Sequence, residues 1–143
     1  MSAKPTPDSL LAANERFYRA FEALDYPAMA ALWAEGEEVF CVHPGWSGLR
    51  GAGPVLESWR RIIANTASIQ FTLTQVKAVV VGEVGVVTLY ENIASQVAGE
   101  PHTATTVATN VFRFDARAGA WKLFHHHASP ASLPGEPREG MLN

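Results

Sequence analysis

The chain shows two hydrophobic periods, one in each half of the sequence. In the first half, Leu10, Phe17, Phe21 and Leu24 are spaced by seven, four and three residues, so they share one face of a helix. The Thr-Pro-Asp before them supplies a capping group and a proline, both favoured where a helix starts. The pattern predicts a helix from about Asp8 to Leu24.

A short second helix is expected directly after the first. Asp25-Tyr26-Pro27 restarts the chain, and Gly36 ends the segment. Met29, Leu32 and Trp33 are its inward-facing residues.

A strand and a third helix complete the first half of the chain. The β-prone segment Glu38–His43 predicts the strand, and a glycine-rich loop from Pro44 to Gly53 follows it. The helix begins near Pro54, with apolar residues at positions i, i+4, i+7 and i+8. Those residues are Val55, Trp59, Ile62 and Ile63.

From Ser68 onward, apolar and polar residues alternate, which is the period of a half-buried strand. The alternation shifts phase after Leu73, so we expect a β-bulge near Gln75. Glycine-containing breaks separate the strands, and such short turns favour antiparallel pairing. The predicted strands are 68–81, Val84–Val97, His102–Phe114 and Gly119–Ala128.

Helices in the first half and strands in the second predict an α+β fold. A length of 143 residues suits one domain, and 48% hydrophobic residues is too many for a disordered chain. We expect a domain over residues 8–130, with flexible ends at 1–7 and 131–143.

Charge, cysteine content and the length of apolar segments indicate which partners and which cellular compartment to expect. The formal net charge is -3 and no basic patch is interleaved with aromatic residues, so nucleic acid is not an expected partner. The single cysteine, Cys41, cannot form an internal disulfide. No segment has the apolar length of a signal peptide or of a membrane span of about 20 residues. We therefore expect a cytoplasmic protein without a membrane partner.

His43 and Asn110 are the first candidates for chemistry. His43 ends a predicted strand before a Pro-Gly turn, and an imidazole can take a proton from carbon or water near neutral pH. Asn110 lies in a strand that is otherwise apolar or threonine-rich, where an inward amide could bind a carbonyl or an oxyanion. The structural alternatives are a histidine that fixes a turn and a buried, satisfied asparagine.

Three consecutive histidines lie in the last predicted strand. Because residues two apart share a face of a strand, an inward Trp121 and Leu123 would place His125 and His127 inside and His126 outside. The inward pair would form a buried polar network or line a polar pocket.

Glu91 lies in the middle of a strand, in the segment TLYENI. It either faces solvent, which is the favoured interpretation, or faces inward and acts as an acid or orients a histidine. Alternation does not decide between Glu91 and Tyr90 as the inward residue. A metal site needs three or four ligands, and Glu91 and His43 could complete one with His125 and His127. We expect instead no metal and no other cofactor.

Aromatic residues could form the wall of a pocket. Trp46 lies in the glycine-rich loop and could belong to a lid. Trp59 and Tyr90 could add aromatic surface, although a tryptophan on a helix face is often plain core.

Several stretches resemble the SnoaL-like branch of the nuclear transport factor 2-like superfamily. They are FYRAFEALDYPAMAALWAEGEEVFCVHPGW, a G-x-x-x-V-x-x-SW pattern ending at Trp59, and NVFRFDARAGAWKLFHHHASP. The resemblance covers about Ser9 to Pro130. It implies a cone of three N-terminal helices packed on a strongly curved antiparallel sheet that encloses a pocket. Members of this superfamily include isomerases, dehydratases, cyclases and kinase association domains, so the fold alone does not fix a function.

The ketosteroid isomerase branch offers a comparison at three positions. His43-Pro44 stands where the resemblance implies an Asp-Pro pair with a general base. Asn110 stands where it implies a protonated aspartate. Phe17 occupies the place of the oxyanion tyrosine, and Tyr18 is about 100° around the helix from it. We therefore do not expect steroid isomerisation.

Three functional hypotheses remain open. The first is a small-molecule-binding domain, with isomerase-, dehydratase- or cyclase-like acid/base chemistry on a hydrophobic carbonyl or ring-containing ligand. The second is a non-catalytic oligomerisation module like the kinase association domains, which the H-x-H-x-S pattern resembles. The third is a polar core without a ligand. For the first, the expected catalytic residues are His43, Asn110 and His127, and the expected ligand-binding residues are Trp46, Trp59, Tyr90, Glu91 and His125.

An uncharged strand face suggests a partner surface. Thr103, Thr105, Val107, Thr109 and Val111 alternate on one face of a predicted strand. In relatives, the outer sheet surface pairs two copies, so the resemblance implies a homodimer through the convex face.

Overall fold

The first helix begins at a capping box. The structure is a computed structural model that describes residues 4–132. Helix α1 spans Pro7–Glu22, and the side chains of Thr6 and Ser9 each accept a hydrogen bond from the other's backbone N–H, both at 3.1 Å. The helix ends two residues before the predicted Leu24, which has a positive φ of 53° and cannot continue it.

The other two helices also match the predicted segments. Helix α2 spans Tyr26–Ala31, and Asp25 caps it by accepting the N–H of Ala28 at 3.0 Å. Helix α3 spans Ala52–Ala64, two residues longer at its start than predicted. Proline is tolerated in the first turn of a helix, so Pro54 need not be the first residue. None of the helices in residues 4–132 is long and apolar enough to cross a membrane.

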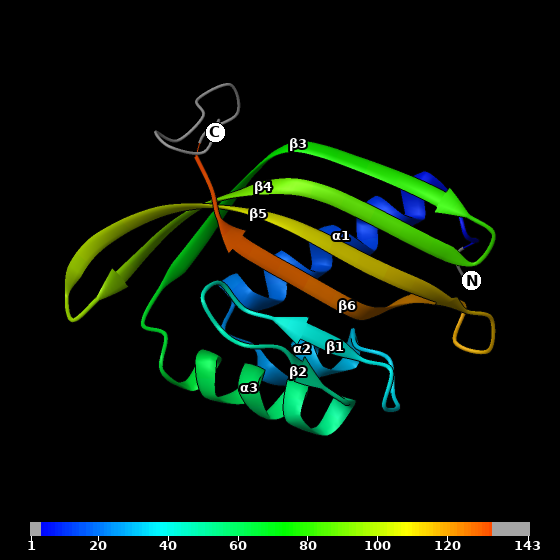
Figure 1. Ribbon diagram of the computed structural model, residues 1–143, viewed down its shortest axis with the longest axis horizontal. Helices are drawn as coiled ribbons and strands as arrows, with labels where there is room; N and C mark the ends of the chain where they lie inside the picture. The colour runs from blue at the N-terminus through cyan, green and yellow to red at the C-terminus, as the bar shows by residue number, and fades with distance from the viewer. Residues whose placement is uncertain (1–3, 133–143) are drawn as a thin grey trace, which may run out of the picture.

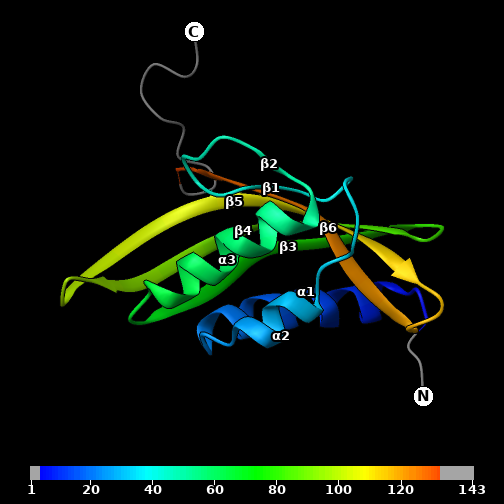
Figure 2. The same ribbon diagram turned by 90° about the horizontal axis from the view of Figure 1, so that it is seen from below.

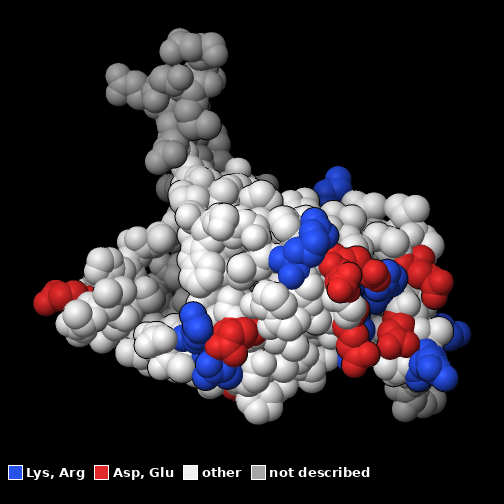
Figure 3. All heavy atoms as spheres, turned by 60° about the horizontal axis from the view of Figure 1, so that its bottom comes forward, with Lys and Arg blue, Asp and Glu red and all other residues white. Residues whose placement is uncertain are grey.

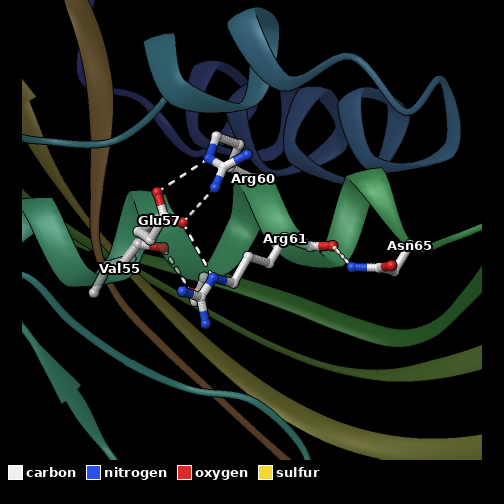
Figure 4. Close-up of polar contacts among 6 residues, drawn as sticks. Val55, Glu57, Arg60, Arg61 and Asn65 are labelled. Carbon is white, nitrogen blue, oxygen red and sulfur yellow. Dashed lines mark hydrogen bonds and ion pairs between the residues drawn. The ribbon is translucent and has the colours of Figure 1, made fainter.

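Charged residues of α3 pair with one another on its outer side. Glu57 accepts hydrogen bonds from the guanidinium groups of Arg60, at 3.0 and 2.5 Å, and Arg61, at 3.1 Å (Figure 4). Figure 3 shows acidic and basic side chains interspersed on the face that it displays. The opposite face of α3 carries Val55 and Trp59, which are buried against the rest of the protein.

Six strands form one curved sheet, with the three helices on one side of it (Figures 1 and 2). The strands are β1 (Phe40–Val42), β2 (Leu49–Arg50), β3 (Ile69–Val81), β4 (Val84–Val97), β5 (Glu100–Asp115) and β6 (Ala120–Pro130). Their order is β2-β1-β6-β5-β4-β3, and only β1 and β6 among these pairs are parallel. The α+β cone is therefore confirmed, although the two-residue strand β2 was not predicted. We call the sheet face toward the helices the inner face.

The predicted bulge in β3 is confirmed. The register between β3 and β4 shifts between Thr74 and Lys77, and Gln75 has a positive φ of 55°. The extra residue turns the following part of the strand and increases the local twist.

A second bulge lies in β6 and was not predicted. Val111 of β5 pairs with His125, whereas the next residue, Phe112, pairs with Leu123. Phe124 is therefore the extra residue. A bulge of this kind reverses the inward and outward alternation beyond it.

Helix α1 approaches the sheet closely at Gly85. A Cβ atom at this position of β4 would lie 2.7 Å from each terminal methyl of Leu10, which is fully buried. Gly85→Ala is expected to lower the free energy of unfolding by about 1–3 kcal/mol, as overpacking usually does.

The stability of Gly85→Ala can be measured by urea denaturation, with Gly53→Ala as the matched control. Nothing lies within 4 Å of a Cβ at Gly53, which is in the first turn of α3, so its stability should stay the same or rise slightly. Equal stability of the two variants would contradict the close packing of α1 on β4.

Candidate functional site

A cavity of about 290 Å³ lies between α1, α3 and the inner face of the sheet. Its walls come from both helices, from the loop after β1 and from strands β3, β4 and β6. The lining residues are Phe17, Tyr18, Phe21, His43, Pro44, Trp46, Trp59, Ile62, Ile69, Phe71, Glu91, Ile93 and His126. The cavity is thus mainly apolar and aromatic, with a few convergent polar groups, which is the composition typical of small-molecule sites.

A larger hollow of about 510 Å³ lies on the surface beside the β5–β6 turn. Three of its four charged residues already have protein partners. Arg113 pairs with Glu38, Lys122 donates to the carbonyl of Ala31, and Asp115 accepts backbone N–H groups of the turn. We therefore take the smaller aromatic cavity as the candidate site.

Two tryptophans flank His43. The His43 ring packs edge-on against Trp59 and against Trp46, with 4.8 Å between centroids in each case. Trp59 is buried, whereas Trp46 is 48% exposed and lines the cavity from the loop after β1. Trp46 therefore lies at the open side of the cavity lining, and its role as a lid residue stays a prediction.

The hydrogen bonds of His43 fix its tautomer. The hydroxyl of Ser58 donates to the carbonyl of Val55 at 2.6 Å, so its proton is already used. The Ser58 Oγ atom lies 2.9 Å from His43 Nε2 and can only accept in this contact. His43 Nε2 therefore carries the proton and donates it to Ser58. Burial lowers the pKa of His43 to about 4, so the ring is neutral at pH 7 with its lone pair on Nδ1.

Glu91 faces the cavity and is buried, so the expectation that it is solvated is wrong. It continues the inward alternation of Val87 and Leu89 along β4, and Tyr90 is half-buried on the other face. Tyr90 is therefore outside the cavity lining, contrary to its expected place in a ligand site.

Two hydroxyl groups hold the Glu91 carboxylate. Tyr18 donates to Oε2 at 2.6 Å and Thr106 donates to Oε1 at 2.5 Å. Burial raises the pKa of Glu91, and the two hydrogen bonds oppose this effect. Burial and the neighbouring carboxylate also raise the pKa of Tyr18, so its hydroxyl keeps its proton.

Asn110 joins three residues behind the cavity. Its amide nitrogen donates to Asn14 Oδ1 at 2.9 Å and to the hydroxyl oxygen of Tyr18 at 3.0 Å. Its oxygen is 2.5 Å from His126 Nδ1, which must be the donor because a carbonyl oxygen only accepts. Asn110 is fully buried and does not line the cavity, so it supports Tyr18 and His126 and does not itself contact the cavity.

His126, and not its two neighbours, points inward. The predicted orientation is wrong because the bulge at Phe124 reverses the alternation after Leu123. His126 is buried, whereas His125 is half-buried beside Phe40 on the outer face and His127 is exposed. The structure thus places neither of the two expected inward histidines in the cavity.

The tautomer of His126 is also fixed. Burial lowers its pKa to about 3, so the ring is neutral. Its Nδ1–H donates to Asn110, which leaves the lone pair on Nε2. Within residues 4–132, Nε2 has no hydrogen-bond partner, and the His126 side chain lines the cavity. We call Tyr18, Glu91 and His126 the polar end of the cavity.

The site shows neither a reactive thiol nor a metal-binding cluster in the part of the chain that the structure describes. Burial raises the pKa of Cys41 to about 12, so the thiol stays protonated although it lies 3.7 Å from His43 Nε2. Residues 4–132 contain no group of three or more His, Cys, Asp or Glu side chains that could hold a metal ion.

Comparison with known families gives a match over residues 10–132, to the SnoaL-like domain. The chain belongs to the SnoaL-like domain family. A solved structure from Streptomyces avermitilis, named as a candidate dehydratase of the NTF2-like family, is 41% identical to this SnoaL-like domain, with a TM-score of 0.82. The alignment covers 89% of this chain and 96% of that one.

Two further relatives of this SnoaL-like domain belong to other functional classes. A candidate calcium/calmodulin-dependent protein kinase type II association domain from Thiobacillus denitrificans is 29% identical, with a TM-score of 0.75 over 92% of this chain and 100% of that one. The F-box protein SKIP8 of Arabidopsis thaliana is 27% identical over 124 residues, 87% of this chain. The chain spans about half the length of that curated relative.

Besides the misplaced His126, sequence reasoning missed four polar residues of the candidate site. They are Asn14, Tyr18, Ser58 and Thr106. Tyr18 was set aside because it lies about 100° from Phe17, yet both are 1% exposed. The sheet curves around α1, so a wide arc of the helix is covered. The available signal was the spacing of Asn14 and Tyr18, which as i and i+4 place two polar groups on one helical stripe.

Proposed function

We propose that this SnoaL-like domain binds a small, largely apolar, ring-containing ligand in the cavity and moves a proton on it. The neutral imidazoles of His43 and His126 are the proposed proton acceptors. The observation that carries the proposal is one cavity in which an aromatic wall faces two neutral imidazoles and a buried carboxylate.

The volume of the cavity limits the size of the ligand. At the packing density of protein interiors, about 0.74, a cavity of 290 Å³ holds a molecule of about 210 Å³. This volume suits one or two rings, and a larger ligand would extend out of the open side of the cavity.

The proposed chemistry follows from the protonation states of the two histidines. A general base must have its lone pair available at the working pH; His126 Nε2 has no partner among the described residues, and His43 Nδ1 has the weak thiol donor of Cys41 at 4.0 Å. Asn110 is proposed as a positioning residue, because its oxygen accepts Nδ1–H of His126 and so holds the lone pair on Nε2. The similarity to a candidate dehydratase supports proton-transfer chemistry of this kind.

The test is isothermal titration calorimetry with 1-naphthalenemethanol, an uncharged two-ring probe. Ile62→Trp should fill the cavity and weaken binding at least about tenfold, because the indole would occupy the ligand volume. Ala64→Trp, an exposed position on the same helix outside the cavity lining, should bind within about twofold of the unchanged protein. Equal binding by both variants, or none by the unchanged protein, would contradict the proposal.

The alternative function is an assembly module. It is favoured by the similarity to a candidate kinase association domain over the whole length of that chain. For the assembly we propose a homodimer through the outer face of β5, where Thr105, Val107, Thr109 and Val111 form an uncharged, half-buried row. Light scattering at micromolar concentration should give the mass of two chains. A monomer would contradict the dimer, and a larger ring of chains that binds no probe would favour the assembly module.

A further inference from the structure

The cavity contains the buried carboxyl group of Glu91 and, among the described residues, no lysine or arginine. Glu91 is 3% exposed, and the cavity lining, all of it within residues 4–132, includes no lysine or arginine. The ion pairs among the described residues do not involve Glu91 either. A carboxylate taken out of water is costly unless a positive charge accompanies it. The protein itself supplies none here.

The polar end of the cavity offers acceptors and no free donors. The hydroxyls of Tyr18 and Thr106 are used on Glu91, and both donor contacts of Asn110 go to Asn14 and Tyr18. Trp59 has an N–H without a partner, but that nitrogen is itself fully buried. The Glu91 oxygens and Nε2 of His126 therefore remain to accept hydrogen bonds from a ligand.

Aromatic rings form most of the remaining wall. Six aromatic side chains line the cavity, and the faces of such rings attract cations. They are Phe17, Tyr18, Phe21, Trp46, Trp59 and Phe71. An aromatic wall around a carboxylate is complementary to an organic ammonium ion in both charge and shape.

We propose that the ligand of this cavity is a small protonated amine that carries an apolar ring, with its N–H groups donating to Glu91 and to Nε2 of His126. The proposal rests on the proposed function, because it names the head group of the same ligand. A neutral alcohol can donate one hydrogen bond but brings no charge. A carboxylic acid would place a second negative charge beside Glu91, and a ketone would find no free donor at the polar end.

Three probes with the same ring system separate these head groups. They are 1-naphthylmethylamine, 1-naphthalenemethanol and 1-naphthoic acid, titrated at pH 7.5 into the full chain by calorimetry. We expect the amine to bind at least about tenfold more tightly than the alcohol, and the acid to bind most weakly. If the alcohol binds as tightly as the amine, the cationic head group is wrong but the cavity remains a ligand site. If none of the probes binds, the proposed function fails as well.

Glu91→Gln tests the residue that supplies the charge. Glutamine keeps the shape, and its oxygen can accept from one of the two hydroxyls while its amide nitrogen donates to the other, so the amine should lose its advantage over the alcohol. Glu100→Gln removes the same charge at an exposed hairpin position and should leave all three affinities unchanged. An unchanged ratio of amine to alcohol in a folded Glu91→Gln protein would overturn the proposal. The comparison of probes on the unchanged protein stands if that variant does not fold.

Discussion

Replacing Asn110 with leucine is expected to lower the free energy of unfolding by about 3–5 kcal/mol. The change removes the partner of His126 Nδ1–H, of Asn14 Oδ1 and of the Tyr18 hydroxyl oxygen at once. Each buried polar group that loses its partner costs about 1–3 kcal/mol, and no water replaces it at a fully buried position. The loss should appear as a lower midpoint in urea denaturation followed by circular dichroism.

Asn92→Leu provides the same chemical change on the neighbouring strand. The Asn92 amide donates to Thr72 and Thr74 in an exposed setting, where water can replace either bond. We expect this variant to lose no more than about 1 kcal/mol. Equal losses for the two variants would mean that the hydrogen bonds around Asn110 contribute little to the stability of the fold.

Acidification from pH 7 to 4.5 is expected to lower the free energy of unfolding. The pKa values of His43 and His126 are lowered to about 4 and about 3, whereas an unfolded histidine titrates near 6.5. Below pH 6.5 the unfolded chain therefore binds protons that the folded chain does not. Stability is fully present above pH 6.5 and is lost as the pH falls toward 4.

The expected size of this effect is large. For His43 alone, the difference between 6.5 and about 4 corresponds to about 3 kcal/mol, and His126 adds a comparable amount. The raised pKa of Glu91 makes the folded state more stable as the pH falls, but this is a single group, whereas two histidines act in the other direction. The unfolding free energy measured between pH 7 and 4.5 should fall by up to about 2.7 kcal/mol per pH unit, the slope for two protons.

His43→Gln should lower the number of protons taken up on unfolding by about one, and so should roughly halve this slope. His102→Gln, which changes an exposed histidine on the β4–β5 hairpin, should leave it unchanged. A flat stability profile between pH 7 and 4.5 would show that the two imidazoles are not held neutral by burial.

Most of the secondary structure could be predicted because the long helices and strands each repeat their pattern of apolar and polar residues several times. Strand β4 has the predicted bounds, Val84–Val97, and the bulge near Gln75 was visible because the alternation continues on both sides of it. Strand β2 has only two residues, so no period can reveal it. The bulge at Phe124 left no signal either, because the segment Phe-His-His-His has no contrast between apolar and polar positions.

The candidate site was predicted only in part because its contacts join distant segments. His43 and Trp46 were found from their place at a strand end and in a glycine-rich loop. The hydrogen bond from Tyr18 to Glu91 spans 73 residues of sequence, and that from Asn110 to Asn14 spans 96. Such pairs depend on how the sheet curves around α1, which no local pattern encodes. The wrong orientation of the histidines followed from one undetected residue insertion in β6.

The most direct test of the ligand site is a crystal structure of the protein soaked with 1-naphthylmethylamine. We predict electron density for the two rings in the cavity between Trp46 and Phe71, with the amine nitrogen within hydrogen-bond distance of Glu91. A saturated crystal in which the probe occupies only surface positions, with this cavity empty or filled by the chain's own side chains, would contradict the account.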